Sequence, residues 1–146
     1  MRQLWPILFL ALGGAAGTLA RVGLAGLVSR LHGGPWPAGT LAVNALGCLL
    51  FGTIWGVLTL RLPQLSPAWS LALLGGFCGA FTTFSTYAFD LARLGGMADP
   101  SGQAAVRGIG PALGYLLLSN VLGLGLVWLG ARHLARWGAV AAGSGG

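Results

Sequence analysis

Four long apolar stretches separated by short breaks make up most of this chain. Each has at least the roughly 20 helical residues that cross about 30 Å of hydrocarbon. Glycines and prolines interrupt the apolar pattern at residues 32–39 and 61–68, and a polar stretch covers residues 95–107. The pattern predicts an all-α membrane protein with a single four-helix transmembrane domain over residues 1–137 and a disordered tail over 138–146. The expected spans are about 4–28, 40–60, 69–94 and 108–131.

The composition agrees with a membrane location. Hydrophobic residues make up 55% of the chain and charged residues only 7%, with a mean hydropathy of +0.81. A soluble domain needs a charged shell, so we expect a multi-pass protein of the inner (plasma) membrane, in contact with lipid. The net charge of +6 comes from arginines that are scattered singly, mostly at the ends of apolar stretches. No basic face concentrates them, so no nucleic-acid partner is expected.

The third apolar stretch differs from an ordinary helix at its centre. Residues 75–89, GGFCGAFTTFSTYAF, combine three glycines with a dense run of Thr, Ser and Tyr. Glycine raises the entropic cost of a helix, and Ser and Thr compete for backbone hydrogen bonds. One interpretation is therefore a third helix broken at mid-membrane, where freed carbonyls bind a cation and freed N–H groups face an anion. The alternative is a continuous helix whose hydroxyls bond to the i−4 carbonyls.

Two other spans carry short rows of uncharged polar residues. Thr40 and Asn44 lie one turn apart in the second span, and Tyr115 and Ser119 lie one turn apart in the fourth, with Asn120 beside them. Such rows are either interhelical hydrogen bonds or a lane of N–H and O–H donors for a dehydrated ion. Together with the hydroxyls of the third span, they favour the lane.

No carboxylate or histidine lies deep in any span, and a single arginine is the exception among charged groups. His32, His133 and Asp90 fall toward helix ends. Proton-coupled transporters need a titratable group near the midplane, and an intramembrane hydrolase needs a general base, so both classes are disfavoured and no enzyme is expected. The exception is Arg21. It either extends to the interface or lies at an aqueous vestibule that draws anions inward.

The arginines give almost no orientation bias. An even number of spans puts both termini on one side, with four arginines there and three on the other: Arg2, Arg61, Arg132 and Arg136 against Arg30, Arg93 and Arg107. The positive-inside rule therefore has little to act on, which is consistent with insertion in both orientations.

Three motifs carry a resemblance to a known family. They are GGAAGTLAR (13–21), GTLAVNALGCLLFG (39–52) and GFCGAFTTFSTYAFD (76–90). With these motifs the chain resembles the Fluc/CrcB family of fluoride channels over about residues 5–131. The resemblance implies a passive, fluoride-selective channel that exports fluoride and so relieves its toxicity. It also implies an antiparallel, dual-topology homodimer with a structural Na+ at the broken third helices.

The resemblance also assigns roles to individual residues. The Na+ ligands would be the backbone carbonyls of Gly79 and Thr82, one pair from each subunit. The fluoride pathway would consist of the pore amide with its neighbouring hydroxyl, an aromatic pair and a polar track: Asn44 and Thr40, Phe84 and Tyr87, Tyr115 and Ser119. The chain departs from the family pattern at Tyr87, where phenylalanine is usual, and at Gly123, where the track has a hydroxyl.

Two other functions are alternatives for a small membrane protein with four spans. A small dual-topology multidrug exporter would require a membrane-embedded glutamate, and this sequence contains none. A non-transporting structural subunit would use the polar rows only to hold helices together.

Overall fold

The structure, a computed structural model, describes residues 4–60, 62–97 and 108–134, and these residues contain helices and turns but no strand. Four helical segments are long and apolar enough to cross a membrane: Leu4–His32, Ala38–Leu60, Pro67–Leu94 and Ile109–Arg132. The predicted all-α class with four candidate spans is confirmed. The first helix extends to His32, beyond the expected end near residue 28. The expected disordered tail, 138–146, lies outside the described residues.

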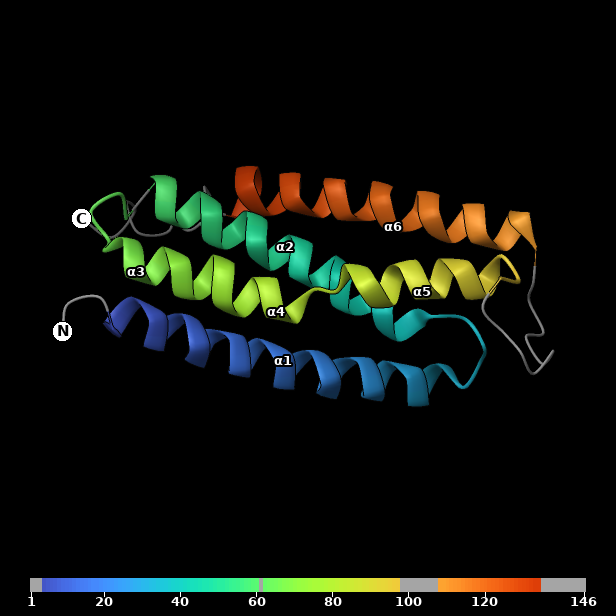
Figure 1. Cartoon of the computed structure of the whole chain (residues 1–146). Helices are drawn as coiled ribbons and strands as arrows, with labels where there is room; N and C mark the ends of the chain where they lie inside the picture. The colour runs from blue at the N-terminus through green and yellow to red at the C-terminus, as the bar shows by residue number, and fades with distance from the viewer. Residues whose placement is uncertain (1–3, 61, 98–107, 135–146) are drawn as a thin grey trace.

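Successive spans alternate in direction, so the molecule is an up-and-down bundle (Figure 1). Helix α1 (Leu4–His32) lies on one flank and packs mainly against the third span. Helix α2 (Ala38–Leu60) packs against α6 (Ile109–Leu129). It also packs against the short π-helix η2 (Gly130–Leu134), which continues α6. The third span thus lies between α1 and the α2–α6 pair.

The residues at the helix ends explain where two spans begin and end. Gly33 has φ +64°, a left-handed conformation that glycine adopts without steric cost, and it ends α1 directly after His32. The third span begins at Pro67, and the Ser66 side chain accepts a hydrogen bond from the Ala68 N–H at 3.4 Å. Proline at the first helical position loses no helical hydrogen bond, so this start is well defined.

The third span is built from several helical pieces. In chain order these are α3 (Pro67–Ser70), the π-helix η1 (Leu71–Cys78), α4 (Gly79–Phe81) and α5 (Phe84–Leu94). The first three pieces run on without a gap, but Thr82 and Thr83 are extended and separate α4 from α5, as Figure 1 shows. That this interruption lies at mid-membrane stays a prediction.

Glycines allow the helices to approach one another at backbone distance. A Cβ added at Gly17 of α1 would overlap the Phe77 carbonyl oxygen, and one at Gly52 of α2 would overlap the Val127 carbonyl oxygen. Such contacts are typical of membrane helices, which lack a hydrophobic force between them. They hold α1 and α6 against the two central spans.

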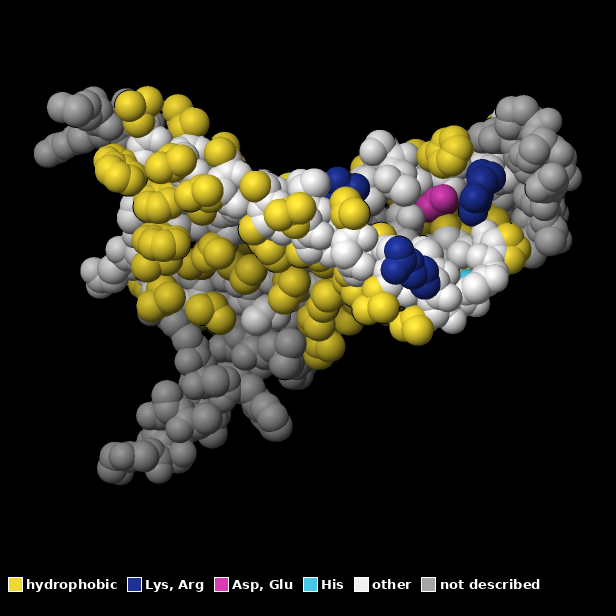
Figure 2. All heavy atoms as spheres, turned by 90° about the horizontal axis from the view of Figure 1, so that it is seen from below, with side chains coloured by type: hydrophobic (Ala, Val, Ile, Leu, Met, Phe, Trp, Pro, Cys, Tyr) yellow, Lys and Arg dark blue, Asp and Glu magenta, His cyan; other side chains and the backbone are white. Residues whose placement is uncertain are grey.

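Most large apolar side chains point outward rather than into a core. Figure 2 shows hydrophobic side chains over much of the visible face, with the visible charged side chains between the middle of the molecule and one end. Within the most apolar 18-residue stretch of α1, only 6% of the residues are buried. A soluble monomer rarely exposes an apolar surface of this extent, so lipid or a partner chain must cover it.

Candidate functional site

The interruption of the third span is held by a side chain of α2. Thr82 (φ −78°, ψ 159°) and Thr83 (φ −146°, ψ 116°) have extended backbones. Asn44 bonds both polar groups of Thr83: its Oδ1 accepts from the Thr83 N–H at 2.8 Å, and its Nδ2 donates to the Thr83 carbonyl at 3.1 Å. These two hydrogen bonds resemble those between neighbouring β-strands. They satisfy the N–H and the carbonyl of Thr83, which would otherwise be costly to bury.

Thr83 also starts the next helix. Its Oγ1 accepts a hydrogen bond from the Thr86 N–H at 3.3 Å, which is an N-cap for α5. The Thr82 hydroxyl donates instead to the Cys78 carbonyl at 3.0 Å.

Two carbonyls lose their helical partners at this point. In a continuous helix the Gly79 carbonyl would accept from the Thr83 N–H, and the Thr82 carbonyl from the Thr86 N–H. Those two N–H groups donate to Asn44 and to the Thr83 hydroxyl. Backbone oxygens that have lost their helical donor are ligands of the kind that hard cations take, so the residues present fit the expected Na+ ligands.

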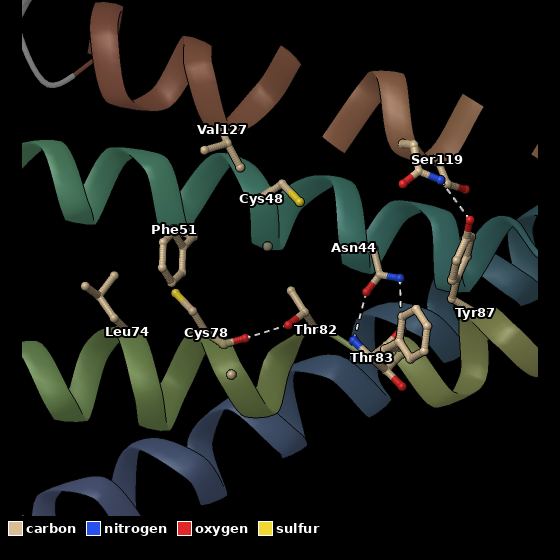
Figure 3. Close-up of a pocket in the computed structure, with 14 residues that line it drawn as sticks. Asn44, Cys48, Phe51, Leu74, Cys78, Thr82, Thr83, Tyr87, Ser119 and Val127 are labelled. Atoms are coloured by element: carbon tan, nitrogen blue, oxygen red, sulfur yellow. Dashed lines mark hydrogen bonds between the residues drawn. The ribbon is translucent and has the colours of Figure 1, made fainter. Parts of the chain in front are cut away.

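A pocket of about 400 Å³ opens beside the interruption, between α2, the third span and α6. Figure 3 shows Asn44 and Cys48 reaching it from α2, Thr82 and Tyr87 from the third span, and Ser119 from α6. Of the residues assigned by the resemblance, those that line the pocket are Asn44, Gly79, Thr82, Phe84, Tyr87 and Ser119.

Neutral donors in this pocket retain unused hydrogens. Asn44 spends one amide hydrogen on Thr83 and keeps the other. The Ser119 hydroxyl is buried and has no hydrogen-bond partner among the described residues. Apolar side chains such as Phe51 and Leu74 form the rest of the wall. A small anion that enters such a pocket can exchange part of its water shell for N–H and O–H donors.

Three aromatic rings lie in sequence at one side of the pocket. The Phe84 and Tyr87 centroids are 6.0 Å apart with ring planes at 49°, and the Tyr87 and Tyr115 centroids are 5.5 Å apart at 41°. Phe84 is 80% exposed, whereas Tyr115 is fully buried. The tilt turns ring edges, which carry partial positive charge, toward neighbouring groups.

Behind this wall lies a second cluster of polar groups. The Tyr115 hydroxyl is close to the side chains of Thr40, Ser119 and Asp90. The Tyr115 hydroxyl and one Asp90 carboxyl oxygen are buried without a hydrogen-bond partner in the described part of the chain. Thr40 and Tyr115 therefore belong to the same polar row as Ser119, although neither lines the pocket itself.

Arg21 approaches the interruption from α1. Its Nε donates to the Ala80 carbonyl at 3.1 Å, and the side chain is half-buried. It thus lies at the end of α4 and does not line the pocket. Its predicted place at an aqueous vestibule stays a prediction.

The comparison with known families decides which family this site belongs to. A family model described as CrcB-like protein, Camphor Resistance (CrcB), matches residues 8–131. The chain belongs to the CrcB family. The match covers all four spans, from α1 to the last turn of the bundle, and so includes each residue of the site described above.

Individual CrcB relatives carry a more specific name. A protein of Nitratidesulfovibrio vulgaris (strain Miyazaki F) is 50% identical over 124 residues, which are 85% of this chain and 92% of that protein. One of Nitrosococcus oceani is 43% identical, covering 84% and 90%, and one of Acidobacterium capsulatum is 42% identical, covering 89% and 93%. Each of the three is named fluoride-specific ion channel FluC.

Three residues at this CrcB site were not assigned from the sequence. Thr83 fixes the interruption, Asn120 bonds the Tyr87 hydroxyl, and Asp90 is only 7% exposed beside Tyr115. Each has a signal in the sequence: Thr83 belongs to the hydroxyl run, Asn120 is next to Ser119, and Asp90 is an isolated acid among apolar residues. Their partners lie 25 to 39 residues away along the chain and could not be paired from periodicity alone.

Proposed function

We propose that this chain is a passive, fluoride-selective channel, not an enzyme, that lets fluoride leave the cell and so relieves its toxicity. The observation that carries the proposal is the pocket at Thr83, where the uncharged donors Asn44, Tyr87 and Ser119 lie within one apolar wall. The names of the relatives support the same function.

Neutral donors suit fluoride for a physical reason. Fluoride is small and strongly hydrated, so a narrow pathway must replace its water with other hydrogen bonds. Amide and hydroxyl groups supply these without a full positive charge, which would hold the ion too tightly to release it. A ring edge, such as that of Phe84 or Tyr87, adds a weak further attraction. Arg21, a permanent positive charge near the interruption, raises the local concentration of anions.

The other two functions are not favoured. A multidrug exporter needs an embedded glutamate, which the sequence lacks. A structural subunit would account for the polar rows but not for the relatives, each of which is named fluoride-specific ion channel FluC.

Liposome flux tests the function directly. Vesicles containing the purified protein are loaded with potassium fluoride, and external fluoride is followed with an electrode. A passive anion pathway should release fluoride only after a potassium ionophore balances the charge, and matched vesicles loaded with potassium chloride should release no chloride. Fluoride release that needs a proton gradient, or no release at all, would reject the proposal.

The pathway is completed, in our proposal, by an antiparallel homodimer. The support is the balance of four arginines against three, the open side of the pocket, and the exposure of Phe84, a large ring that a second copy would cover. Two copies in opposite orientation would bring two interruptions together near the dimer axis.

The proposed homodimer would also form the binding site of the structural Na+. The Gly79 and Thr82 carbonyls of each copy would hold the ion, which supplies positive charge to backbone oxygens that lipid cannot satisfy. Replacing Na+ with a large organic cation during long dialysis should lower the melting temperature of the dimer, and re-added Na+ should restore it. A melting temperature independent of Na+ would count against the ion.

A further inference from the structure

A chain of hydrogen bonds links the α6 backbone to the hydroxyl of Tyr87. The Asn120 amide nitrogen donates to the Leu116 carbonyl at 2.8 Å and to the Tyr87 hydroxyl oxygen at 2.9 Å. A carbonyl can only accept, so the nitrogen and not the oxygen of the Asn120 amide must face Leu116. The orientation of the amide is therefore fixed by the backbone of its own helix.

This orientation decides the role of the Tyr87 hydroxyl. Since Asn120 offers it an N–H, the hydroxyl must act as the acceptor in this bond. Its own hydrogen is left over, and no described residue accepts it. Tyr87 lines the pocket together with Asn44 and Ser119, and Figure 3 shows it reaching from the third span toward α6.

The ring itself has little freedom to turn away. Phe84 lies against one side at a centroid distance of 6.0 Å, and Tyr115 lies against another at 5.5 Å. Tyr115 is completely buried and cannot give way easily. The hydroxyl is thus held at one place in the pocket.

We propose that Asn120 is a positioning residue that makes the Tyr87 hydroxyl a hydrogen-bond donor to a small, strongly hydrated anion in this pocket. The inference rests on the proposed fluoride function. It adds a hydroxyl donor that phenylalanine at position 87 cannot provide, and it assigns a role to Asn120. Any ligand of the site must be a strong acceptor, as fluoride is and the larger halides are not.

The test measures fluoride efflux from liposomes over a range of fluoride concentrations. Four proteins are compared: wild type, Tyr87→Phe, Asn120→Leu and the double variant. Each single variant should raise the fluoride concentration at half-maximal efflux about two- to tenfold, since Tyr87→Phe removes the donor and Asn120→Leu removes the bond that orients it. The double variant should be no worse than either single variant. Asn120→Ala, which favours a helix and introduces no bulk, repeats the measurement should leucine disturb the fold.

Several outcomes would overturn the proposal. Unchanged half-maximal concentrations in both Asn120 variants, or effects of the two positions that add independently, would show that Asn120 does not act through Tyr87. In either case wild-type efflux would still support the proposed function. If wild type releases no fluoride, the proposed function and this inference both fail.

Discussion

At the scale of single residues, the site depends on which hydrogens are already in use. Asn44 uses two hydrogen bonds to hold the backbone where the third helix breaks: one to the Thr83 N–H and one to the Thr83 carbonyl. No described residue accepts its second amide hydrogen, which stays available to the pocket. Asn44, which the sequence predicts as a pore donor, therefore also holds the backbone of the third span in its extended conformation. Substitutions here must separate the two roles.

Replacing Asn44 with leucine should damage both roles. Two backbone groups of Thr83 lose their partner, at a cost of about 1–3 kcal/mol each if they stay buried, and the pocket loses a donor. We expect a clearly lower melting temperature and fluoride efflux close to background. Thr59→Val is the matched control, because it removes an α2 hydroxyl that bonds only within its own helix. Wild-type efflux through a stable Asn44→Leu dimer would refute the pore role.

Tyr115 offers the opposite test. Its hydroxyl is buried without a hydrogen-bond partner among the residues that the structure describes, so Tyr115→Phe should leave stability unchanged or slightly higher. If that hydroxyl serves the ion, fluoride efflux should still fall several-fold. Thermal melting and liposome efflux measured on the same preparation distinguish these effects. A loss of stability with normal efflux would make Tyr115 a packing residue.

At the scale of elements, the interrupted span is the feature that organises the others. Apolar length alone predicts four spans, and the run of glycines and hydroxyls in residues 75–89 indicates where one of them weakens. The bonds that fix the weak point cannot be predicted in this way. Asn44 is 39 residues from Thr83 and Arg21 is 59 from Ala80, and helical periodicity tells which face a residue occupies but not which helix it meets.

Two adjacent threonines should respond differently to the same change. Thr83→Val removes the cap of α5 and should cost about 1 kcal/mol, within the range of about 0.5–2 kcal/mol for N-cap losses. Thr82→Val removes only a hydroxyl bond to the Cys78 carbonyl, which keeps its bond from the Thr82 N–H. It should cost less than half as much. Melting temperatures of the two variants compare them directly, and equal losses would argue against the cap.

Close packing of α1 on η1 gives a second prediction at this scale. A methyl group at Gly17 would overlap the Phe77 carbonyl, a backbone atom that cannot move without shifting the helix. Gly17→Ala should therefore lower the melting temperature substantially. Gly14→Ala is the control, because an added methyl there meets nothing within 4 Å. Similar melting temperatures for both variants would contradict the packing.

At the scale of the whole molecule, the exposed apolar surface and the balanced arginines lead to the same expectation. A chain with no orientation bias can supply both copies of an antiparallel pair, and the pair covers surface that one copy leaves open. The site residues of one chain would then face their counterparts across the dimer axis.

Biased chains test this assembly. Pro63→Lys with Gln64→Lys adds charge at one end of the bundle, and His32→Lys with Gly34→Lys adds it at the other, all at exposed positions. Each biased chain expressed alone should insert one way and release no fluoride, whereas the two expressed together should restore efflux. Full efflux from one biased chain alone would reject dual topology.

The interruption at Thr82 and Thr83 also divides the third span electrically. The helical run from Pro67 to Phe81 ends there with the negative pole of its dipole, and α5 begins two residues later with its positive pole. Arg21 bonds the Ala80 carbonyl at the negative pole. Gly79 and Thr82 from that side of the break line the same pocket as Thr83 and Phe84 from the positive pole. One break in one helix thus presents partial charges of both signs to a single pocket. An anion near the start of α5 gains about 0.3–1 kcal/mol, and a cation is favoured near the carbonyls that end α4.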